Sequence, residues 1–221
     1  MNKNYWSKYY LNSKKEISFP AEAVIRIFRG TFPKLRIKFK KKQKILDVGF
    51  GDGRHLNFFK HLGLNVYGVE VAQNIIKKIK EKKNNLYFGF ANNLPFRSDY
   101  FNLLLSWNSC YYMGKNKNNL NFNKVIFEFK RVLKQNGYLI ISVPTQKSFI
   151  FEKSIKINSK YRKISNDYFR LRNGEIMRCY NNKSELKNDF KKYFKNFCFS
   201  TIDIDCFGLA YHWIVMVAQK K

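Results

Sequence analysis

The sequence predicts an α/β fold in which a mostly parallel sheet is covered by helices on both faces. From residue 44 onward, short apolar segments alternate with amphipathic ones, which is typical of a parallel sheet buried on both sides. Near the end of the sequence, residues 206–210 form a short link between two apolar segments and permit an antiparallel hairpin. The prediction is a doubly wound sheet of seven strands whose last strand runs antiparallel.

The individual elements follow from hydrophobic periodicity. Apolar or β-branched runs predict strands at 44–48, 66–71, 86–91, 101–107, 138–143, 197–203 and 211–218. Amphipathic or apolar segments at 21–28, 54–62, 74–83, 122–133 and 184–194 fit helices. We expect the helix at 122–133 to end at Asn136 and Gly137, because both residues tolerate a positive φ.

The chain reads as a single domain, 1–221, in four parts. Residues 1–43 are a helical or irregular N-terminal cap, and residues 44–144 are the core. In the cap, Trp6, Tyr9 and Tyr10 could close over a site, but hydrophobic packing within the cap explains them equally well. Residues 145–180 fit no regular pattern and are expected to be an insertion over one end of the sheet, near a substrate site. Residues 181–221 supply the last helix and the edge hairpin.

Composition excludes several classes of protein. The chain has 221 residues, of which 45% are hydrophobic and 26% are charged, a globular balance. No apolar run approaches a membrane span, and the first 15 residues lack the apolar core of a signal peptide. The four cysteines are far apart, which argues against a zinc ribbon or a disulfide framework. We expect a cytoplasmic protein without a metal site.

The net charge of +28 does not by itself identify a partner. Most of the basic residues are lysine, and they accompany many asparagines over the whole chain, a pattern that an AT-rich genome also produces. Proteins that read phosphates or bases usually rely on arginine. The densest basic run, 34–44, is either an anion-attracting surface or a solvated face. Nucleic acid is therefore a less favoured partner than a small molecule.

A glycine-rich turn is the most informative stretch of the sequence. Gly49, Gly51 and Gly53 follow a predicted strand and open a helix, the geometry in which backbone approaches a ligand closely. Glu70 ends the next strand, where a carboxylate can accept hydrogen bonds from ribose hydroxyls. The G-x-G-x-x-G spacing of dinucleotide-binding proteins is not met, because residue 54 is arginine. The glycines could merely allow a tight turn, and Glu70 could be an exposed charge.

Four motifs in this order resemble those of class I S-adenosylmethionine-dependent methyltransferases, whose fold is Rossmann-like. The segment 47–53, Asp-Val-Gly-Phe-Gly-Asp-Gly, is similar to the first motif, and 68–70 to the second. Residues 94–96, Leu-Pro-Phe, followed by 99–102, and the segment 131–137 are similar to motifs of the small-molecule branch. The resemblance covers residues 44–144 well and 180–220 loosely.

The resemblance implies S-adenosylmethionine as cofactor and assigns residues to it. The residues implied in cofactor binding are Asp47, Gly49, Gly51, Gly53, Glu70, Ala91, Asn92, Leu94 and Trp107. Gly49 and Gly51 would line the methionine part, Glu70 would hold the ribose, and Ala91 and Asn92 would contact adenine. Phe90 departs from the family, which often has aspartate there, so Phe90 would pack on adenine or Asn92 would supply the polar contact.

Catalysis and the acceptor are less determined by the sequence. Methyl transfer is an in-line displacement that depends chiefly on positioning, and no obvious base is present. His55, Tyr111, His212 and Glu175 are candidates without a ranking, although a structural or cofactor-side role suits His55 better than that of a base, and a structural role suits His212 better. Trp107, Tyr111 and Tyr112 could be core residues. Cys110 lacks the context of a nucleophilic cysteine.

Motif absences narrow the acceptor class. No D/N-P-P-Y/F run follows the fourth strand, which favours a small-molecule, sugar or lipid-linked acceptor. An RNA methyltransferase that uses the basic surface, or a non-catalytic protein that binds RNA or a membrane surface, remains the alternative. The oligomeric state is open.

Overall fold

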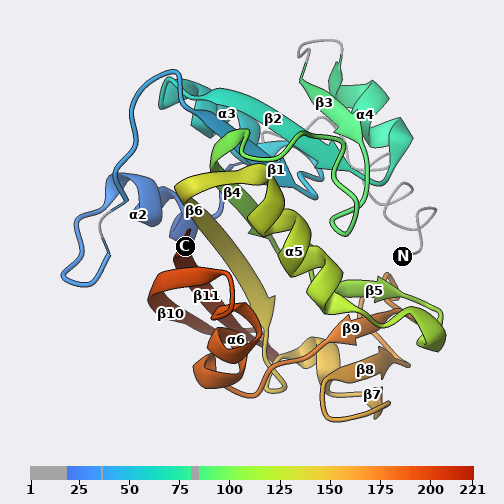
Figure 1. Cartoon of the computed structure of the whole chain (residues 1–221). Helices are drawn as coiled ribbons and strands as arrows, with labels where there is room; N and C mark the ends of the chain where they lie inside the picture. Colours follow the sequence, from blue (N-terminus) through green and yellow to red (C-terminus); the bar gives the residue numbers. More distant parts are fainter. Residues whose placement is uncertain (1–18, 36, 81–84) are drawn as a thin grey trace.

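The computed structural model describes residues 19–35, 37–80 and 85–221, so Trp6, Tyr9 and Tyr10 lie outside the described residues. Two sheets organise this part of the chain (Figure 1). The large sheet contains β1 (Lys44–Val48), β2 (Asn65–Glu70), β3 (Leu86–Phe88), β4 (Phe101–Trp107), β6 (Leu133–Pro144), β10 (Phe194–Cys206) and β11 (Leu209–Lys220). The small sheet contains β5 (Tyr112–Gly114), β7 (Ser154–Lys156), β8 (Tyr161–Ile164) and β9 (Ile176–Arg178).

The large sheet has the strand order β10-β11-β6-β4-β1-β2-β3. Its neighbours from β6 to β3 all run parallel, whereas β11 is antiparallel to both β6 and β10. The predicted α/β fold, with seven mostly parallel strands and an antiparallel last strand, is therefore confirmed. β11 lies between β10 and β6, so β10, the first strand of the hairpin, forms the edge of the sheet.

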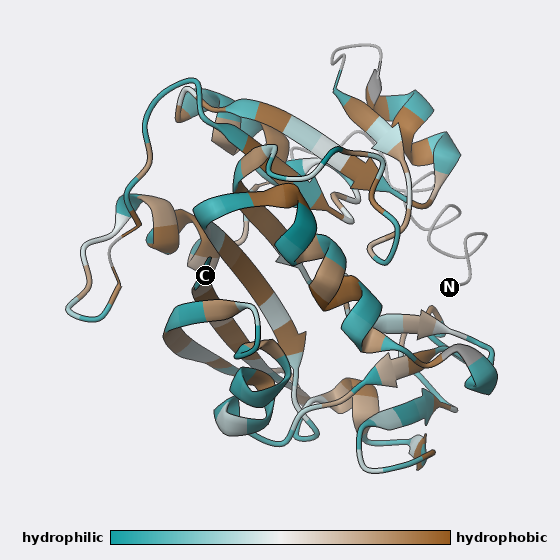
Figure 2. Ribbon diagram, viewed as in Figure 1, coloured by the Kyte–Doolittle hydropathy of each residue, from teal (hydrophilic) through white to brown (hydrophobic). Residues whose placement is uncertain are grey.

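Helices cover both faces of the large sheet, as predicted. One face packs against α2 (Glu22–Arg29), α3 (Arg54–His61) and α4 (Gln73–Lys80) through residues such as Phe28, Phe59 and Ile75. The other packs against α5 (Phe122–Val132) and α6 (Lys183–Phe190), with Phe129 and Phe190 fully buried. Figure 2 shows β6 apolar along much of its length, while α5 carries both apolar and polar residues. This is the pattern of a sheet buried between two layers.

Residues 145–180 are not irregular, which corrects the sequence prediction. They contain the short 3-10 helix η2 (Phe149–Phe151) and the strands β7, β8 and β9. β5, which follows β4 in sequence, pairs with β9 and completes the small sheet. These strands have only three or four residues each, so hydrophobic alternation had too few positions to be visible.

Element ends also differ from the expectations. The helix predicted to reach residue 133 ends at Val132, and Leu133 is already extended with ψ 139°. Asn136 does adopt a left-handed φ of 58°, but within the path of β6 and not as a helix cap. The strand expected over 86–91 ends at Phe88, and the helix expected over 184–194 ends at Phe190.

The direction of the parallel strands places the basic run far from their carboxyl ends. Residues 37–43 lead directly into Lys44, the first residue of β1, whereas the glycine-rich turn follows Val48 at its other end. The basic side chains in the described part of this run therefore lie toward the amino edge of the sheet. Ligands of open α/β sheets bind outside the carboxyl edge.

Candidate cofactor and acceptor site

The turn after β1 has a backbone that strongly favours glycine. Gly49, Gly51 and Gly53 have φ values of 73°, 55° and 80°, a region in which an L-residue with a side chain is strained. A Cβ on Gly49 would also lie 2.4 Å from the Cβ of Ser109. The Ser109 hydroxyl donates to the Val48 carbonyl oxygen at 2.6 Å, so β1 and the segment after β4 are in direct contact here.

Glu70 is buried beside this turn at the end of β2. Its carboxylate accepts hydrogen bonds from the backbone N–H groups of Gly51 at 3.1 Å, Val71 at 2.7 Å and Ala72 at 3.3 Å. Burial raises the pKa of the Glu70 carboxyl, and the three N–H donors oppose that shift. An acceptor in this position can also receive the two hydroxyls of a ribose.

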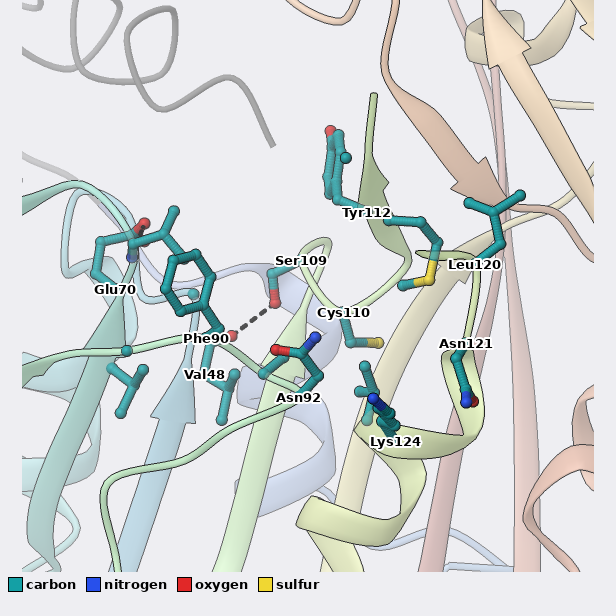
Figure 3. Close-up of a pocket in the computed structure, with 18 of the residues that line it drawn as sticks. Val48, Glu70, Phe90, Asn92, Ser109, Cys110, Tyr112, Leu120, Asn121 and Lys124 are labelled. Carbon is teal, nitrogen blue, oxygen red and sulfur yellow. Dashed lines mark hydrogen bonds between the residues drawn. The ribbon is translucent and has the colours of Figure 1, made fainter. Parts of the chain in front are cut away.

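A cavity of about 640 Å³ opens between these groups, and we call it the cofactor cavity. Its walls come from the ends of β1 and β2, the segment after β3, the segment after β4 and the start of α5 (Figure 3). The labelled lining residues are Val48, Glu70, Phe90, Asn92, Ser109, Cys110, Tyr112, Leu120, Asn121 and Lys124. Ala91 and Gly49 also line it. Four predicted cofactor residues, Gly49, Glu70, Ala91 and Asn92, thus meet in one cavity.

Two distant motifs hold the wall that contains Ala91 and Asn92. Arg131 at the end of α5 donates to the carbonyl oxygens of Phe96 at 2.6 Å and Leu94 at 3.0 Å. It also pairs with Glu128, which accepts a hydrogen bond from the Leu94 N–H at 2.7 Å. Leu94 itself is buried in the core and does not line the cofactor cavity. The structure therefore gives Leu94 a supporting position.

A second cavity, of about 300 Å³, adjoins the first, and we call it the acceptor cavity. The two cavities share the lining residues Gly49 and Tyr112. Aromatic side chains dominate its walls: Phe50, Trp107, Tyr111, Tyr112, Phe169, Tyr211 and Trp213. Gly51, Arg54, His55, Asn108 and Arg172 also line it. The predicted residues Gly51 and Trp107 thus face this second cavity.

A buried ion pair fixes one wall of the acceptor cavity. The Arg172 guanidinium contacts both carboxylate oxygens of Asp167, at 2.9 and 3.1 Å, and donates through Nε to the Tyr112 hydroxyl at 3.2 Å. Tyr111 stacks on Tyr112 with ring centroids 4.9 Å apart. Burial raises the pKa of both tyrosines, so both phenols remain protonated at neutral pH.

Asp47 and Gly53 line neither cavity. Asp47 is fully buried, and neither carboxylate oxygen has a hydrogen-bond partner among the described residues. Its Oδ2 lies 3.6 Å from Nδ1 of His55. Gly53 is the N-cap of α3. Both residues therefore belong to the support of the glycine-rich turn and not to its ligand-facing surface.

The four candidate bases differ in position and in hydrogen bonding. His55 lines the acceptor cavity, but its Nε2 accepts a hydrogen bond from the Ala21 N–H at 3.3 Å, so this nitrogen is occupied. Tyr111 lines the same cavity and its raised pKa excludes a role as base near neutral pH. His212 lines neither cavity and contacts the Thr145 hydroxyl through Nδ1 at 2.7 Å. Glu175 is fully buried. No base emerges among these candidates.

Cys110 lines the cofactor cavity, and burial raises the pKa of its thiol to about 12. The thiolate is the reactive form, so we expect Cys110→Ala to retain cofactor binding and methyl transfer within about twofold of the parent. We also expect iodoacetamide at pH 7.5 to label the exposed Cys206 well before Cys110, as measured by peptide mass spectrometry. Rapid loss of activity on labelling Cys110 alone would contradict this.

Sequence reasoning did not assign Ser109, Lys124, Phe169, Arg172 or Tyr211 to the site. Ser109 had a usable signal, since it follows the predicted strand at 101–107 by two residues. The others come from segments that lie far from the glycine-rich turn in sequence. The packing of α5 brings Lys124 to the carboxyl edge of the large sheet, and the packing of the small sheet and of the hairpin brings the other three.

Residues 46–141 match the family model described as a methyltransferase domain. This segment contains the glycine-rich turn, Glu70, and the segments after β3 and β4 that line the cofactor cavity. This match assigns residues 46–141 to a methyltransferase domain. The expected S-adenosylmethionine-dependent methyltransferase domain, with S-adenosylmethionine as its cofactor, is thereby confirmed.

The chain is also similar to known proteins in sequence and in structure. The uncharacterized protein MJ0638 of Methanocaldococcus jannaschii is 26% identical over 79% of this chain and 60% of its own length. The chain thus spans about 60% of the length of that curated relative. A crystal structure of an S-adenosylmethionine-dependent methyltransferase from Methanosarcina mazei has a TM-score of 0.65 at 16% identity, covering 91% of this chain and 98% of the other.

A third similar protein has an acceptor in its crystal structure. It is the 1,6-didemethyltoxoflavin-N1-methyltransferase of Burkholderia thailandensis, solved with 1,6-didemethyltoxoflavin and S-adenosylhomocysteine bound. Its TM-score is 0.61 at 16% identity, and the match covers 99% of this chain and 84% of that one. At this identity the likeness establishes the fold.

The methyltransferase domain fits its cofactor on structural grounds. Ser109 leaves no room for a side chain at position 49, since a Cβ there would lie 2.4 Å from the Ser109 Cβ, and Gly49 itself lines the cofactor cavity. Gly49, Glu70, Ala91 and Asn92 surround one cavity, in which Glu70 would hold the ribose and Ala91 with Asn92 the adenine. Phe90 lines the same cavity and would supply an apolar surface for the adenine ring.

Proposed function

We propose that the protein transfers a methyl group from S-adenosylmethionine to a small-molecule acceptor bound in the acceptor cavity. The observation that carries this proposal is the pair of adjoining cavities, which share Gly49 and Tyr112. A volume of about 300 Å³ suits a compact ligand. Its many aromatic walls suit a flat or cationic group, which aromatic faces bind by stacking or by cation–π attraction.

Methyl transfer from S-adenosylmethionine depends chiefly on how the protein positions the acceptor. S-adenosylmethionine, when bound, supplies an electrophilic methyl group for in-line displacement. Residues at the shared wall would align the attacking atom with that methyl group, and such alignment removes much of the entropic part of the barrier. Tyr112 is suited to this task because Arg172 and Asp167 hold its hydroxyl in place.

The relatives support the acceptor class without identifying the acceptor. The similar protein from Burkholderia thailandensis is named as an N1-methyltransferase of 1,6-didemethyltoxoflavin, and its structure holds that compound. In this chain, the basic run lies toward the amino edge of the sheet, away from both cavities, so it is poorly placed to guide RNA to the methyl group. None of the described helices is both long and apolar enough to cross a membrane.

The acceptor class can be tested with radiolabelled methyl transfer. Purified protein, S-adenosyl-L-[methyl-³H]methionine and size-fractionated cell extract would be incubated together, with bulk tRNA and rRNA as separate acceptor pools. We expect the label in the small-molecule fraction. Label confined to RNA would overturn the proposal and favour the RNA methyltransferase, and cofactor binding without transfer to any pool would favour a non-catalytic binding protein.

Tyr112→Phe is expected to lower the turnover number about threefold to tenfold, because it removes one hydrogen bond at the shared wall of the two cavities. The affinity for S-adenosylhomocysteine, measured by calorimetric titration, should change by less than about twofold, since the ring remains. Tyr168→Phe is the matched control, because Tyr168 is exposed and lines neither cavity. Equal turnover in the two variants would exclude a positioning role for the Tyr112 hydroxyl.

A further inference from the structure

A third cavity is separate from the site. It has a volume of about 500 Å³ and shares no lining residue with the cofactor cavity or the acceptor cavity. It lies between α2, the turn at 32–35 and the β10–β11 hairpin, and we call it the α2 groove. In Figure 1, α2 and the hairpin are near each other at the left of the view.

The walls of the α2 groove are mainly apolar. Ala23 and Ile27 contribute from α2, Phe32 and Leu35 from the turn, and Phe199 and Val217 from the hairpin. Several of these side chains remain partly accessible in the described structure, among them Ala23, Leu35 and Phe199. The groove is therefore an open apolar surface and not a sealed part of the core.

The geometry of the groove is held by contacts outside its apolar lining. Phe32 and Leu35 form a β-bridge across the turn, and the Cys198 thiol donates to the Lys34 carbonyl oxygen at 2.8 Å. The turn is thus bonded to itself and to β10. A groove that is already formed before a ligand binds loses less conformational entropy on binding.

The charged groups of the α2 groove have one sign. Its charged lining residues are Arg26 and Lys34, and no acidic residue is among the described residues that line it. Arg26 pairs with Glu22 on the exposed side of α2 at 2.6 Å, whereas Lys34 is exposed and begins the basic run. The lysines that follow, at 38 and 40–42, extend the positive surface beyond the groove.

We propose that the α2 groove binds a single-chain anionic amphiphile, with the hydrocarbon chain against the apolar walls and the anionic head beside Lys34. A neutral apolar ligand would make no use of the lysine, and a cationic amphiphile would be repelled by it. The overall charge of +28 further raises the local concentration of anions. This inference is independent of the acceptor, because the groove and the site have no lining residue in common.

The test is calorimetric titration of the full chain with sodium dodecanoate below its micelle concentration, and with dodecyltrimethylammonium as the oppositely charged probe. We expect one dodecanoate per chain and no saturable binding of the cation. Ala23→Phe, which fills the groove from α2, should abolish the saturable binding. Lys34→Glu should weaken it about tenfold, because an attractive contact becomes a repulsive one.

Lys156→Glu is the matched control, since Lys156 is an exposed lysine on β7 and the substitution makes the same change in net charge. It should leave dodecanoate binding within about twofold of the parent. Titration with S-adenosylhomocysteine checks that each variant is folded. Binding of many dodecanoates per chain, equal losses in Lys34→Glu and Lys156→Glu, or recruitment of intact anionic vesicles unaffected by Ala23→Phe would each overturn the proposal.

Discussion

Gly49→Ala is expected to abolish measurable binding of S-adenosylhomocysteine. The substitution places a side chain at a φ of 73°, which costs about 1–2 kcal/mol in backbone strain. Its Cβ would also meet the Ser109 Cβ at 2.4 Å. Ser109 cannot easily move away, because its hydroxyl is bonded to the Val48 carbonyl oxygen and to the Ser106 hydroxyl at 2.6 and 2.7 Å. The turn must therefore shift into the space that the cofactor needs.

Calorimetric titration and thermal unfolding measure the two parts of this effect. Gly208→Ala is the matched control, because Gly208 has a φ of 90° and nothing lies within 4 Å of its Cβ position. It should lose about 1–2 kcal/mol of stability from strain and keep its affinity for S-adenosylhomocysteine. Gly49→Ala should lose more stability than the control and all binding. An affinity equal to that of the control would show that the turn does not contact the cofactor.

Glu70→Gln is expected to weaken S-adenosylhomocysteine binding by about 10- to 100-fold. The carboxylate accepts three backbone N–H groups and would in addition hold the ribose hydroxyls. An amide keeps one acceptor oxygen, but its NH₂ group is itself a donor and cannot accept from the Gly51 N–H or from a hydroxyl. Each lost hydrogen bond to a charged group costs about 1.5–3 kcal/mol, which gives the expected range.

The same carboxylate makes cofactor binding dependent on pH. Burial raises the Glu70 pKa above the usual glutamate range, so affinity is complete above that raised pKa and falls as the pH decreases through it. The affinity for S-adenosylhomocysteine should therefore begin to fall at a higher pH than the pKa of an exposed glutamate would give. Glu70→Gln should abolish this pH dependence. Glu185→Gln is the control for both measurements, because Glu185 lies in the first turn of α6, is partly exposed and lines neither cavity. A pH profile unchanged by Glu70→Gln would contradict the assignment of Glu70 to the ribose.

The cofactor half of the site could be predicted from the sequence because its determinants are local. Three glycines within five residues specify a turn with positive φ values, and a glutamate at the end of the next parallel strand must lie beside that turn. The near-continuous apolar strands likewise specified the large sheet and its two helical layers. In each case the structure depends on residues that are close in sequence or lie on adjacent strands. The residue pattern is therefore sufficient to predict the turn and the large sheet.

The acceptor half was decided by tertiary structure. Tyr112, Arg172 and Tyr211 come from β5, the segment before β9, and β11, which are as much as 99 residues apart in sequence. β5 and β9 have three residues each, too few to display a period. They are strands because they pair with each other, and β9 also pairs with β8. The α2 groove has the same origin, since α2 meets the hairpin from the other end of the chain. Local pattern determined the cavity in which we place the cofactor, whereas long-range pairing shaped the cavity in which we place the acceptor.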